Sequence, residues 1–384
     1  MGDTYTFSPK LRNVTITLIF LGIVTTTIGF YIDNGKTWAN YLLNNYYFTM
    51  LSIGAMFFLA IQYITRSGWS ALFTRIPHVI GYYLPVAGVL MLFLIFGMHW
   101  LYPWSRSGTL AEDPLIAHKA PYLNIPFFFI RMVVFFSLWI FMTLLLRKMS
   151  FKEDREGRLH YFHKSEFYSK VYIFIIAVST TFATFDLIMS IDVHWYSTIF
   201  AVKNFISGFY HAVAVIILII LFLNHKGFYP QLNKHHLHDF SKYLFILSLI
   251  WAYLWFVQYL LIWFTNIPEE TIYYVTRTEW KWRVFFYLNI ILNWFIPFFM
   301  LLSNKADSNK RVIWVVCIIS LIGMWVDLYL QIMPGSTGKF GIGFIEVGMF
   351  AGFSGLFVLV IAWGLSRIPL VPKNHPYLKE SINH

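Results

Sequence analysis

The chain is 384 residues long, with 58% hydrophobic and only 12% charged residues and a formal net charge of +11. Soluble domains carry about 25% charged residues, so this composition excludes a soluble globular protein, and the basic excess is first a matter of membrane topology, not of nucleic acid. The single cysteine, Cys317, excludes an intramolecular disulfide and a cysteine cluster for zinc or iron–sulfur binding.

Ten apolar segments follow one another along the chain, each close to the ~20 residues that a helix needs to cross ~30 Å of hydrocarbon. The sequence therefore predicts an all-α polytopic membrane protein with about ten transmembrane helices, forming a single integral membrane domain over 1–384. The first segment is not followed by an A-x-A cleavage site, so we expect it to be retained. The segments lie near 13–32, 45–65, 77–99, 124–147, 171–190, 199–223, 241–264, 284–302, 312–330 and 342–366.

The basic residues are distributed unevenly between the two ends of these segments. Ten crossings put both termini on one side, where 20 of the 29 Lys and Arg residues lie; 8 lie on the other side, and Arg131 lies within the fourth segment. Because Lys and Arg accumulate in cytoplasmic loops, both termini are predicted to be cytoplasmic. The most basic connection, from Arg147 to Lys170, is expected to be a solvated loop that sets this topology.

A weak internal repeat relates the fifth segment to the ninth. Ser179 precedes Asp186 by seven residues, and Ser320 precedes Asp327 by the same interval. The offset of four segments predicts two four-helix bundles, made of helices 2–5 and 6–9, with helices 1 and 10 flanking them. Both units have the same orientation, unlike the inverted repeats of many transporters. The two units cover 45–190 and 199–330.

Polar residues form a stripe along the fifth segment. Tyr172, Ser179 and Asp186 are spaced by seven, so they share one helix face and span ~21 Å from the inner surface to the outer half of the membrane. Hydroxyl groups both accept and donate hydrogen bonds, as a proton relay requires, although hydroxyls alone also serve to hold helices together. We interpret these three residues as candidates for a proton path.

Ionisable residues recur in four further segments. A charge at the bilayer centre costs at least ~2.5 kcal/mol, so such residues are by default functional or paired. Lys203 and His211 share a face of the sixth segment, with His211 near mid-membrane. Asp327, Glu346 and Arg131 complete the candidates, and we expect a charge cluster in the outer half. Arg131 is predicted to form a structural ion pair with a carboxylate that the sequence leaves open.

The chain offers few ligands for a cofactor. A b-type haem requires facing histidine pairs deep in the bundle, but only His211 is deep, whereas His78 and His99 lie at opposite ends of the third segment. The histidines of the NKHHLHD loop, 233–239, permit a metal site, although a solvated histidine run is the expectation. We therefore expect no metal or other cofactor on this chain.

The segment DLIMSIDVHWYSTIFAVKNFISGFYHA, residues 186–212, resembles the NrfD-like membrane subunits of bacterial alternative complex III, and among them the ActF type. The likeness is carried by its two acidic residues, the serine between them and the His-Trp-x-Ser-Thr-x-Phe motif at 194–200. The ten helices, two four-helix units and inner termini agree with it. The Asp-Val-His-Trp order at 192–195 differs from the Pro-Gly-Trp-His order of quinol-binding members, so the resemblance does not carry a quinol site over to these residues.

The resemblance implies an integral subunit of a respiratory quinol:cytochrome c oxidoreductase in the bacterial inner membrane. Its implied partners are a second NrfD-like subunit, an iron–sulfur protein and a multihaem cytochrome c, which hold the iron–sulfur clusters and haem c, together with membrane lipid and no nucleic acid. The ActF type is expected to contribute proton conduction, and quinol remains an open ligand. A quinol-binding subunit, a proton-coupled transporter and a non-catalytic scaffold are the alternatives.

Overall fold

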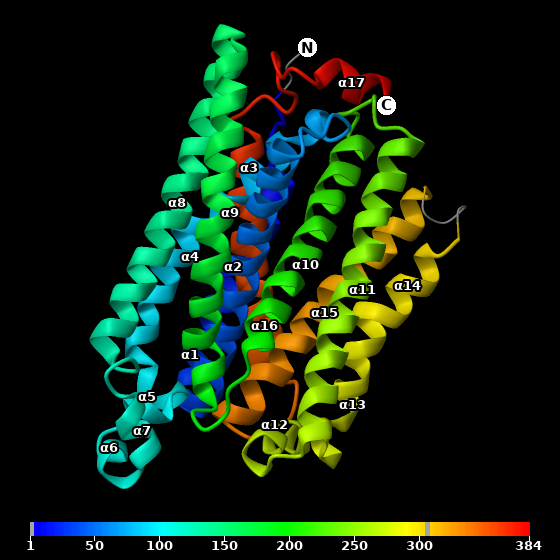
Figure 1. The fold of residues 1–384 in the computed structure, drawn as a ribbon. Helices are drawn as coiled ribbons and strands as arrows, with labels where there is room; N and C mark the ends of the chain where they lie inside the picture. The colour runs from blue at the N-terminus through cyan, green and yellow to red at the C-terminus, as the bar shows by residue number, and fades with distance from the viewer. Residues whose placement is uncertain (1–3, 304–307) are drawn as a thin grey trace.

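The computed structural model describes residues 4–303 and 308–384, and the described chain consists of helices and their connections, without strands (Figure 1). Ten helical spans in these residues are long and apolar enough to cross a membrane, which confirms the predicted all-α multi-pass class. Eight of the described spans are built on one long helix each, namely α1 (Pro9–Ile32), α2 (Asn34–Ile64), α8 (Ile125–Glu156), α9 (Leu159–Leu187), α10 (Thr198–His225), α11 (Lys234–Thr265), α15 (Lys310–Ser336) and α16 (Phe344–Leu365).

The third and eighth spans are interrupted, each just before a proline. Pro85 has no N–H to donate to the carbonyl of Gly81, and the third span breaks between α3 and α4 at this point. Pro297 likewise cannot donate to the carbonyl of Asn293, and a π-helical turn precedes it. The pieces of these spans are η1 (Ala71–Phe73), α3 (Arg75–Ile80), α4 (Tyr83–Leu92) and η2 (Phe93–Phe96), then α13 (Trp280–Ile290), η5 (Ile291–Phe295) and α14 (Ile296–Leu301).

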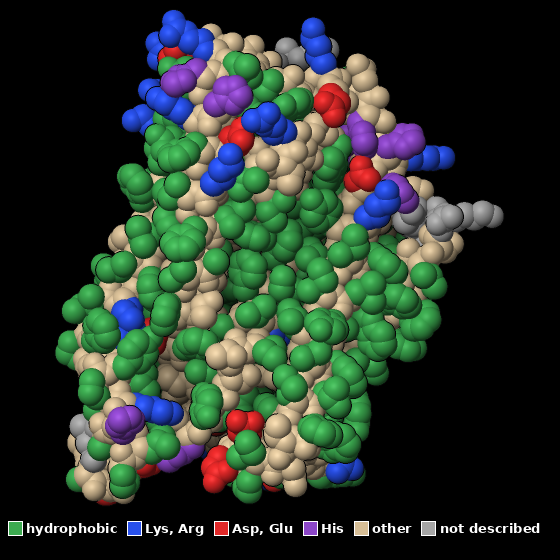
Figure 2. Space-filling view, viewed as in Figure 1, with side chains coloured by type: hydrophobic (Ala, Val, Ile, Leu, Met, Phe, Trp, Pro, Cys, Tyr) green, Lys and Arg blue, Asp and Glu red, His purple; other side chains and the backbone are tan. Residues whose placement is uncertain are grey.

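Both ends of the chain lie at the same end of the helix bundle, as ten crossings require (Figure 1). Lys and Arg side chains gather at this end, whereas a broad hydrophobic belt covers the middle of the molecule (Figure 2). We call it the terminal end, and its cytoplasmic location remains a prediction. Short helices occupy the connections, namely α5 (Met98–Leu101), η3 (Pro103–Ser105), α6 (Thr109–Glu112), α7 (Pro114–Lys119), η4 (Met189–Ile191), α12 (Pro268–Thr278) and α17 (Leu378–Asn383).

Two long helices, α2 and α10, form the centre of the bundle. They pack closely because both carry a glycine at their contact: a Cβ atom on Gly54 would lie only 2.4 Å from the carbonyl oxygen of Gly208. Helix α2 contacts α9 and α15, and α10 contacts the same two helices. Helices α2 and α10, which begin the two predicted four-helix units, therefore each pack against α9 and α15, which end them.

The flanking helices α1 and α16 pack against each other through a second pair of glycines. A Cβ atom on Gly22 would lie 2.4 Å from the Cα atom of Gly352. Small residues of this kind let transmembrane helices approach closely, and α1 is otherwise largely exposed along its membrane span.

The prediction of a solvated loop from Arg147 to Lys170 is wrong. Helix α8 continues to Glu156 and α9 begins at Leu159, so this region is a helical hairpin that turns at Gly157, whose φ is +66° (Figure 1). Hydropathy marks only the part of a helix that crosses hydrocarbon, and these two helices extend beyond it. The hairpin brings polar side chains of both helices into the protein interior.

Candidate functional site

Arg131 and Asp186 form a buried ion pair between α8 and α9. The Nε and Nη2 atoms of Arg131 donate to the two carboxylate oxygens at 2.7 and 3.0 Å, and Nη1 donates to the backbone carbonyl of Tyr122 at 3.0 Å. The guanidinium also lies over the rings of Tyr122 and Phe127, at 3.9 and 4.3 Å from their centroids. A bidentate, buried pair with a third hydrogen bond to the backbone is suited to a structural clamp, and it identifies the acid that the sequence left open.

The hydroxyls of Tyr172 and Ser179 both contact one tryptophan, Trp139 of α8. The indole N–H donates to Ser179 Oγ at 2.7 Å, and Tyr172 donates to the Trp139 carbonyl at 3.1 Å, with Thr143 a further 3.0 Å partner of Tyr172. An indole N–H only donates and cannot pass a proton on. The stripe thus lies on one buried face, but the described hydrogen bonds do not join Tyr172 and Ser179 into a relay that reaches Asp186.

Lys203 and Asp327 form a second buried ion pair, between α10 and α15. The lysine Nζ lies 2.8 and 2.9 Å from the two carboxylate oxygens, and both side chains are almost fully buried. As at Asp186, the serine seven residues earlier is hydrogen-bonded to an aromatic side chain, because Ser320 Oγ lies 2.8 Å from the hydroxyl of Tyr210. The two serine–aspartate motifs therefore occupy similar surroundings.

A chain of amides connects Asp327 to His211. Asn289 Nδ2 donates to Asp327 at 3.0 Å, Asn293 Nδ2 donates to Asn289 Oδ1 at 2.7 Å, and Asn293 Oδ1 lies 2.9 Å from His211 Nε2. Asn293 lies in the π-helical turn before Pro297. It packs against Gly323 of α15, where a Cβ atom would come within 2.6 Å of its Oδ1 atom. The charge of Asp327 is thus linked to the mid-membrane histidine by directed hydrogen bonds.

The direction of these bonds follows from the carboxylate, which only accepts when ionised. Each amide must turn its NH₂ group toward Asp327 and its oxygen toward His211, so Nε2 of His211 carries a proton. Nδ1 of His211 lies 2.6 Å from the carbonyl oxygen and 3.4 Å from the hydroxyl of Ser207. A protonated ring donates to this carbonyl through Nδ1, whereas a neutral ring with its proton on Nε2 can accept only the longer, 3.4 Å contact from the hydroxyl.

A narrow cavity adjoins the Lys203–Asp327 pair. Its volume is about 20 Å³, enough for one water molecule. Gln331 lines it and is only 4% exposed, yet neither polar atom of its side-chain amide has a hydrogen-bond partner among the described residues. Arg277 also lines it and donates to the carbonyl of Leu330 at 2.8 Å, which Pro334 leaves without its usual backbone donor. The site can therefore exchange hydrogen bonds with a water molecule.

Glu346 belongs to a third, separate group. Its Oε1 atom accepts from Asn40 at 2.9 Å and pairs with Lys36 at 3.0 Å, while Oε2 accepts from the backbone of Gly343 at 2.8 Å. The expected single charge cluster in the outer half is therefore wrong. Residues at a similar depth face different neighbours, and the structure divides them into three ion pairs, Arg131–Asp186, Lys203–Asp327 and Lys36–Glu346.

A polar cluster near the terminal end was missed by sequence reasoning. Arg75 is completely buried, donates to Ser150 at 2.9 Å and pairs with Asp154. The neighbouring carboxyl of Glu153 is buried, and its Oε1 atom has no partner among the described residues. The same is true of the side-chain oxygens of Tyr63, Ser165 and Ser169. Buried polar groups of this kind are typically satisfied by ordered water.

The polar cluster leads to the stripe on α9, because Ser165, Ser169 and Tyr172 follow one another at helical spacing. The sequence carried a signal for this polar cluster, because the spacing of Ser165 and Ser169 continues the polar stripe of α9 toward the terminal end. The loop interpretation of this region concealed it.

The prediction of a solvated histidine run at 233–239 agrees with the exposed His235 but is wrong for His236. His236 is fully buried, accepts from the backbone N–H of Asn233 and lies 2.9 Å from the carbonyl of Ser381 through Nε2. Its side chain therefore helps to cap the first turn of α11 and anchors the C-terminal segment. No group of three or more metal-ligating side chains suited to an ion occurs in the part of the chain that the structure describes.

The fold and this interior polar network define a multi-pass helical membrane protein with paired charges inside the bundle. No protein-family model and no curated protein matches the chain. The comparisons therefore add no family to the argument from residues and geometry.

Proposed function

We propose that this chain is an integral membrane subunit of a respiratory quinol:cytochrome c oxidoreductase and contributes proton conduction coupled to quinol oxidation by neighbouring subunits. The observation that carries the proposal is the hydrogen-bonded chain from Asp327 through Asn289 and Asn293 to His211. It links a buried acid, next to a cavity with room for water, to a mid-membrane histidine that has a hydrogen-bond partner in either protonation state.

The likeness of residues 186–212 to NrfD-like subunits is the reason for proposing a respiratory complex as the assembly. In this account the partners are a second NrfD-like subunit, an iron–sulfur protein and a multihaem cytochrome c in the bacterial inner membrane. His211 is the group that takes up and releases the proton, and Asn293 and Asn289 link it to the polar cavity at the Lys203–Asp327 pair.

A scaffold is the second candidate, and one observation favours it. The carboxylates of Asp186, Asp327 and Glu346 are each paired with a cation, and Arg131 also donates to the backbone carbonyl of Tyr122. We therefore assign a structural role to Arg131 and Asp186. The proposed proton conduction therefore depends on residues of the second four-helix unit, 199–330.

Purification of the native assembly tests the proposal. We expect the chain to co-purify with a multihaem cytochrome c and an iron–sulfur protein, and quinol oxidation in proteoliposomes to be accompanied by proton translocation. Asn293→Leu is expected to reduce translocation because it breaks the link to His211. The matched control is Asn44→Leu, since Asn44 is also a buried amide that donates to the carbonyl four residues earlier in its helix but lies outside the network.

Two results would contradict the proposal. Purification without any redox partner, together with solute uptake by the isolated chain, would instead support a transporter. Normal proton translocation by the Asn293→Leu assembly would leave the scaffold as the better account.

A further inference from the structure

An apolar groove lies on the half of the helix bundle that is nearest the terminal end. Its volume is about 540 Å³, and its walls come from α10, α15 and α16, with α2 behind them and Tyr5 and Leu11 of the N-terminal segment at its edge. Residues of α10 and α15 that line it include Leu218, Phe222, Ile318 and Ile322. The groove lies in the membrane-spanning part of these helices, so its apolar surface faces lipid rather than water.

The groove continues into a second hollow at its terminal end, because Phe222 lines both. The second hollow, which we call the basic mouth, is lined by residues at the end of α10 and the start of α15. Its polar and interfacial residues are Asn224, His225, Lys310, Arg311 and Trp314. An apolar groove with a basic opening is thus shared between two neighbouring helices.

Within the described part of the chain, neither cation of the basic mouth has an acidic partner. Lys310 donates to the amide oxygen of Asn224 at 2.7 Å, and neither Lys310 nor Arg311 has a carboxylate within ion-pair distance among residues 4–303 and 308–384. Both side chains are exposed, and Trp314 is 52% exposed one turn further along α15. Tryptophan prefers the interface between headgroups and hydrocarbon, so the cations lie at headgroup level.

The geometry points to an anionic phospholipid as the occupant of this groove, with its phosphate held by Lys310 and Arg311 and an acyl chain lying between α10 and α16. From Arg311 to Ile322 the helix rises ~16 Å, which matches the ~15 Å of hydrocarbon in one leaflet. Basic pockets between transmembrane helices are suited to anionic lipid headgroups.

A transmembrane helix of a partner fits the groove less well. Helix–helix contacts in membranes favour small residues that let the backbones approach, whereas this groove is lined mainly by Leu, Ile, Val and Phe and stops near mid-membrane. A partner helix would also leave the cations of the basic mouth without a counter-charge.

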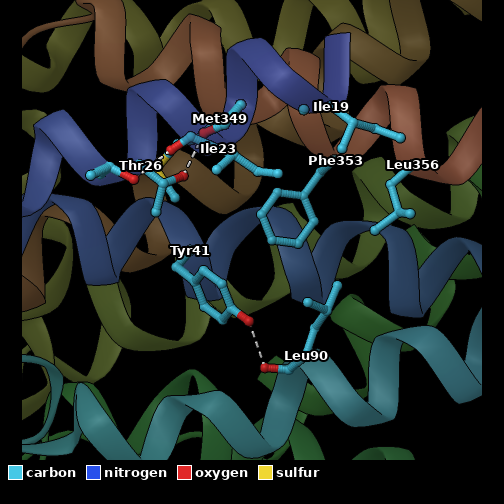
Figure 3. A pocket seen from close by; sticks show the side chains of 11 residues that line it. Ile19, Ile23, Thr26, Tyr41, Leu90, Met349, Phe353 and Leu356 are labelled. Atoms are coloured by element: carbon cyan, nitrogen blue, oxygen red, sulfur yellow. Dashed lines mark hydrogen bonds between the residues drawn. The ribbon is translucent and has the colours of Figure 1, made fainter. Parts of the chain in front are cut away.

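A second apolar groove, between α1, α16, α2 and α4, lacks these features (Figure 3). It is lined by no Lys or Arg, and Tyr41 donates to the carbonyl of Leu90 at 2.8 Å. Thr26 and Thr27 donate to carbonyls of their own helix at 2.7 and 2.9 Å. Its polar groups are already satisfied, so nothing there would hold a charged headgroup.

Native mass spectrometry of the purified chain, or of its assembly, with phosphatidylglycerol and phosphatidylcholine offered in equal amounts tests this site. We expect preferential retention of phosphatidylglycerol, and Lys310→Gln/Arg311→Gln should weaken that retention roughly 30-fold. The matched control is Lys148→Gln/Lys164→Gln, which removes the same charge from exposed lysines at the same end, on α8 and α9. Inorganic phosphate alone should not compete, because it lacks the acyl chain.

A groove-filling variant, Ser354→Trp, provides an independent readout, since Ser354 lines the groove on α16. It should reduce lipid retention with the cations intact. Equal retention of the two lipids by the unmodified protein would overturn the inference. So would unchanged retention in both the Lys310→Gln/Arg311→Gln and Ser354→Trp variants, or loss of a partner subunit from Ser354→Trp with lipid retention unchanged, which would identify a helix as the occupant.

Discussion

Replacing Asp186 with Asn tests whether the Arg131–Asp186 pair is a structural clamp. The substitution keeps the size of the side chain but removes the charge opposite Arg131, a residue that is only 7% exposed. Loss of one partner from a buried ion pair costs roughly 3–5 kcal/mol, because the remaining charge is left uncompensated. Arg131 would retain the Tyr122 carbonyl and two aromatic rings, so we expect a loss of unfolding free energy within this range.

The double variant Arg131→Met/Asp186→Leu separates a clamp from a proton carrier. Replacing a whole buried pair by apolar residues is often neutral or stabilising, so this variant should recover most of the stability lost in Asp186→Asn. Reversible unfolding in mixed micelles measures both changes. Asp113→Asn is the control, because its pair with His194 is partly exposed and should contribute at most ~1 kcal/mol.

The reasoning would be refuted by a double variant as unstable as Asp186→Asn, or by a single variant as stable as the unmodified protein. It would also be refuted if the double variant were stable but the assembly no longer translocated protons. That result would return Asp186 to the proton path.

Three further changes test other parts of the structure. Gly323→Ala places a methyl group 2.6 Å from Asn293 Oδ1 and should lower proton translocation by displacing this amide, measured with a pH-sensitive dye in proteoliposomes. Gly54→Ala brings a methyl group within 2.4 Å of the Gly208 carbonyl and should cost about 1–3 kcal/mol of unfolding free energy; unchanged stability would argue against this close contact. Burial and the nearby positive charge of Arg75 lower the pKa of His375 to about 4. Because the unfolded chain binds a proton below pH ~6.5 and the folded chain does not, stability should fall by on the order of 3 kcal/mol as the pH drops from 6.5 to 4, and His375→Gln should remove this dependence in a pH series of unfolding measurements.

The ten spans could be predicted from hydropathy because the length and polarity of each segment are local properties. The ionisable residues inside them, such as Lys203, His211 and Asp327, could be identified for the same reason. Their partners could not, since pairing depends on how the helices are rotated and which helices are neighbours. Residues at one depth were therefore expected to form a single cluster, whereas the structure separates them into pairs.

The two asparagines of the network were missed because neutral amides do not stand out by charge. A sequence signal was available: Asn289 and Asn293 are one turn apart on an apolar helix, and Pro297 follows one turn later. A proline at this spacing disturbs the backbone at the second asparagine, and π-helical turns are frequent at functional sites. Such amides next to a proline are a useful pattern to examine in other apolar segments.

The number of protons translocated per electron by the assembly that carries His211→Gln tests the central claim most directly. Glutamine preserves hydrogen bonding to Asn293 but cannot take up a proton near neutral pH. We predict that the assembly remains intact and oxidises quinol while its proton-to-electron ratio falls below that of the unmodified complex. An unchanged ratio would contradict the assignment of His211 as the group that takes up and releases the proton.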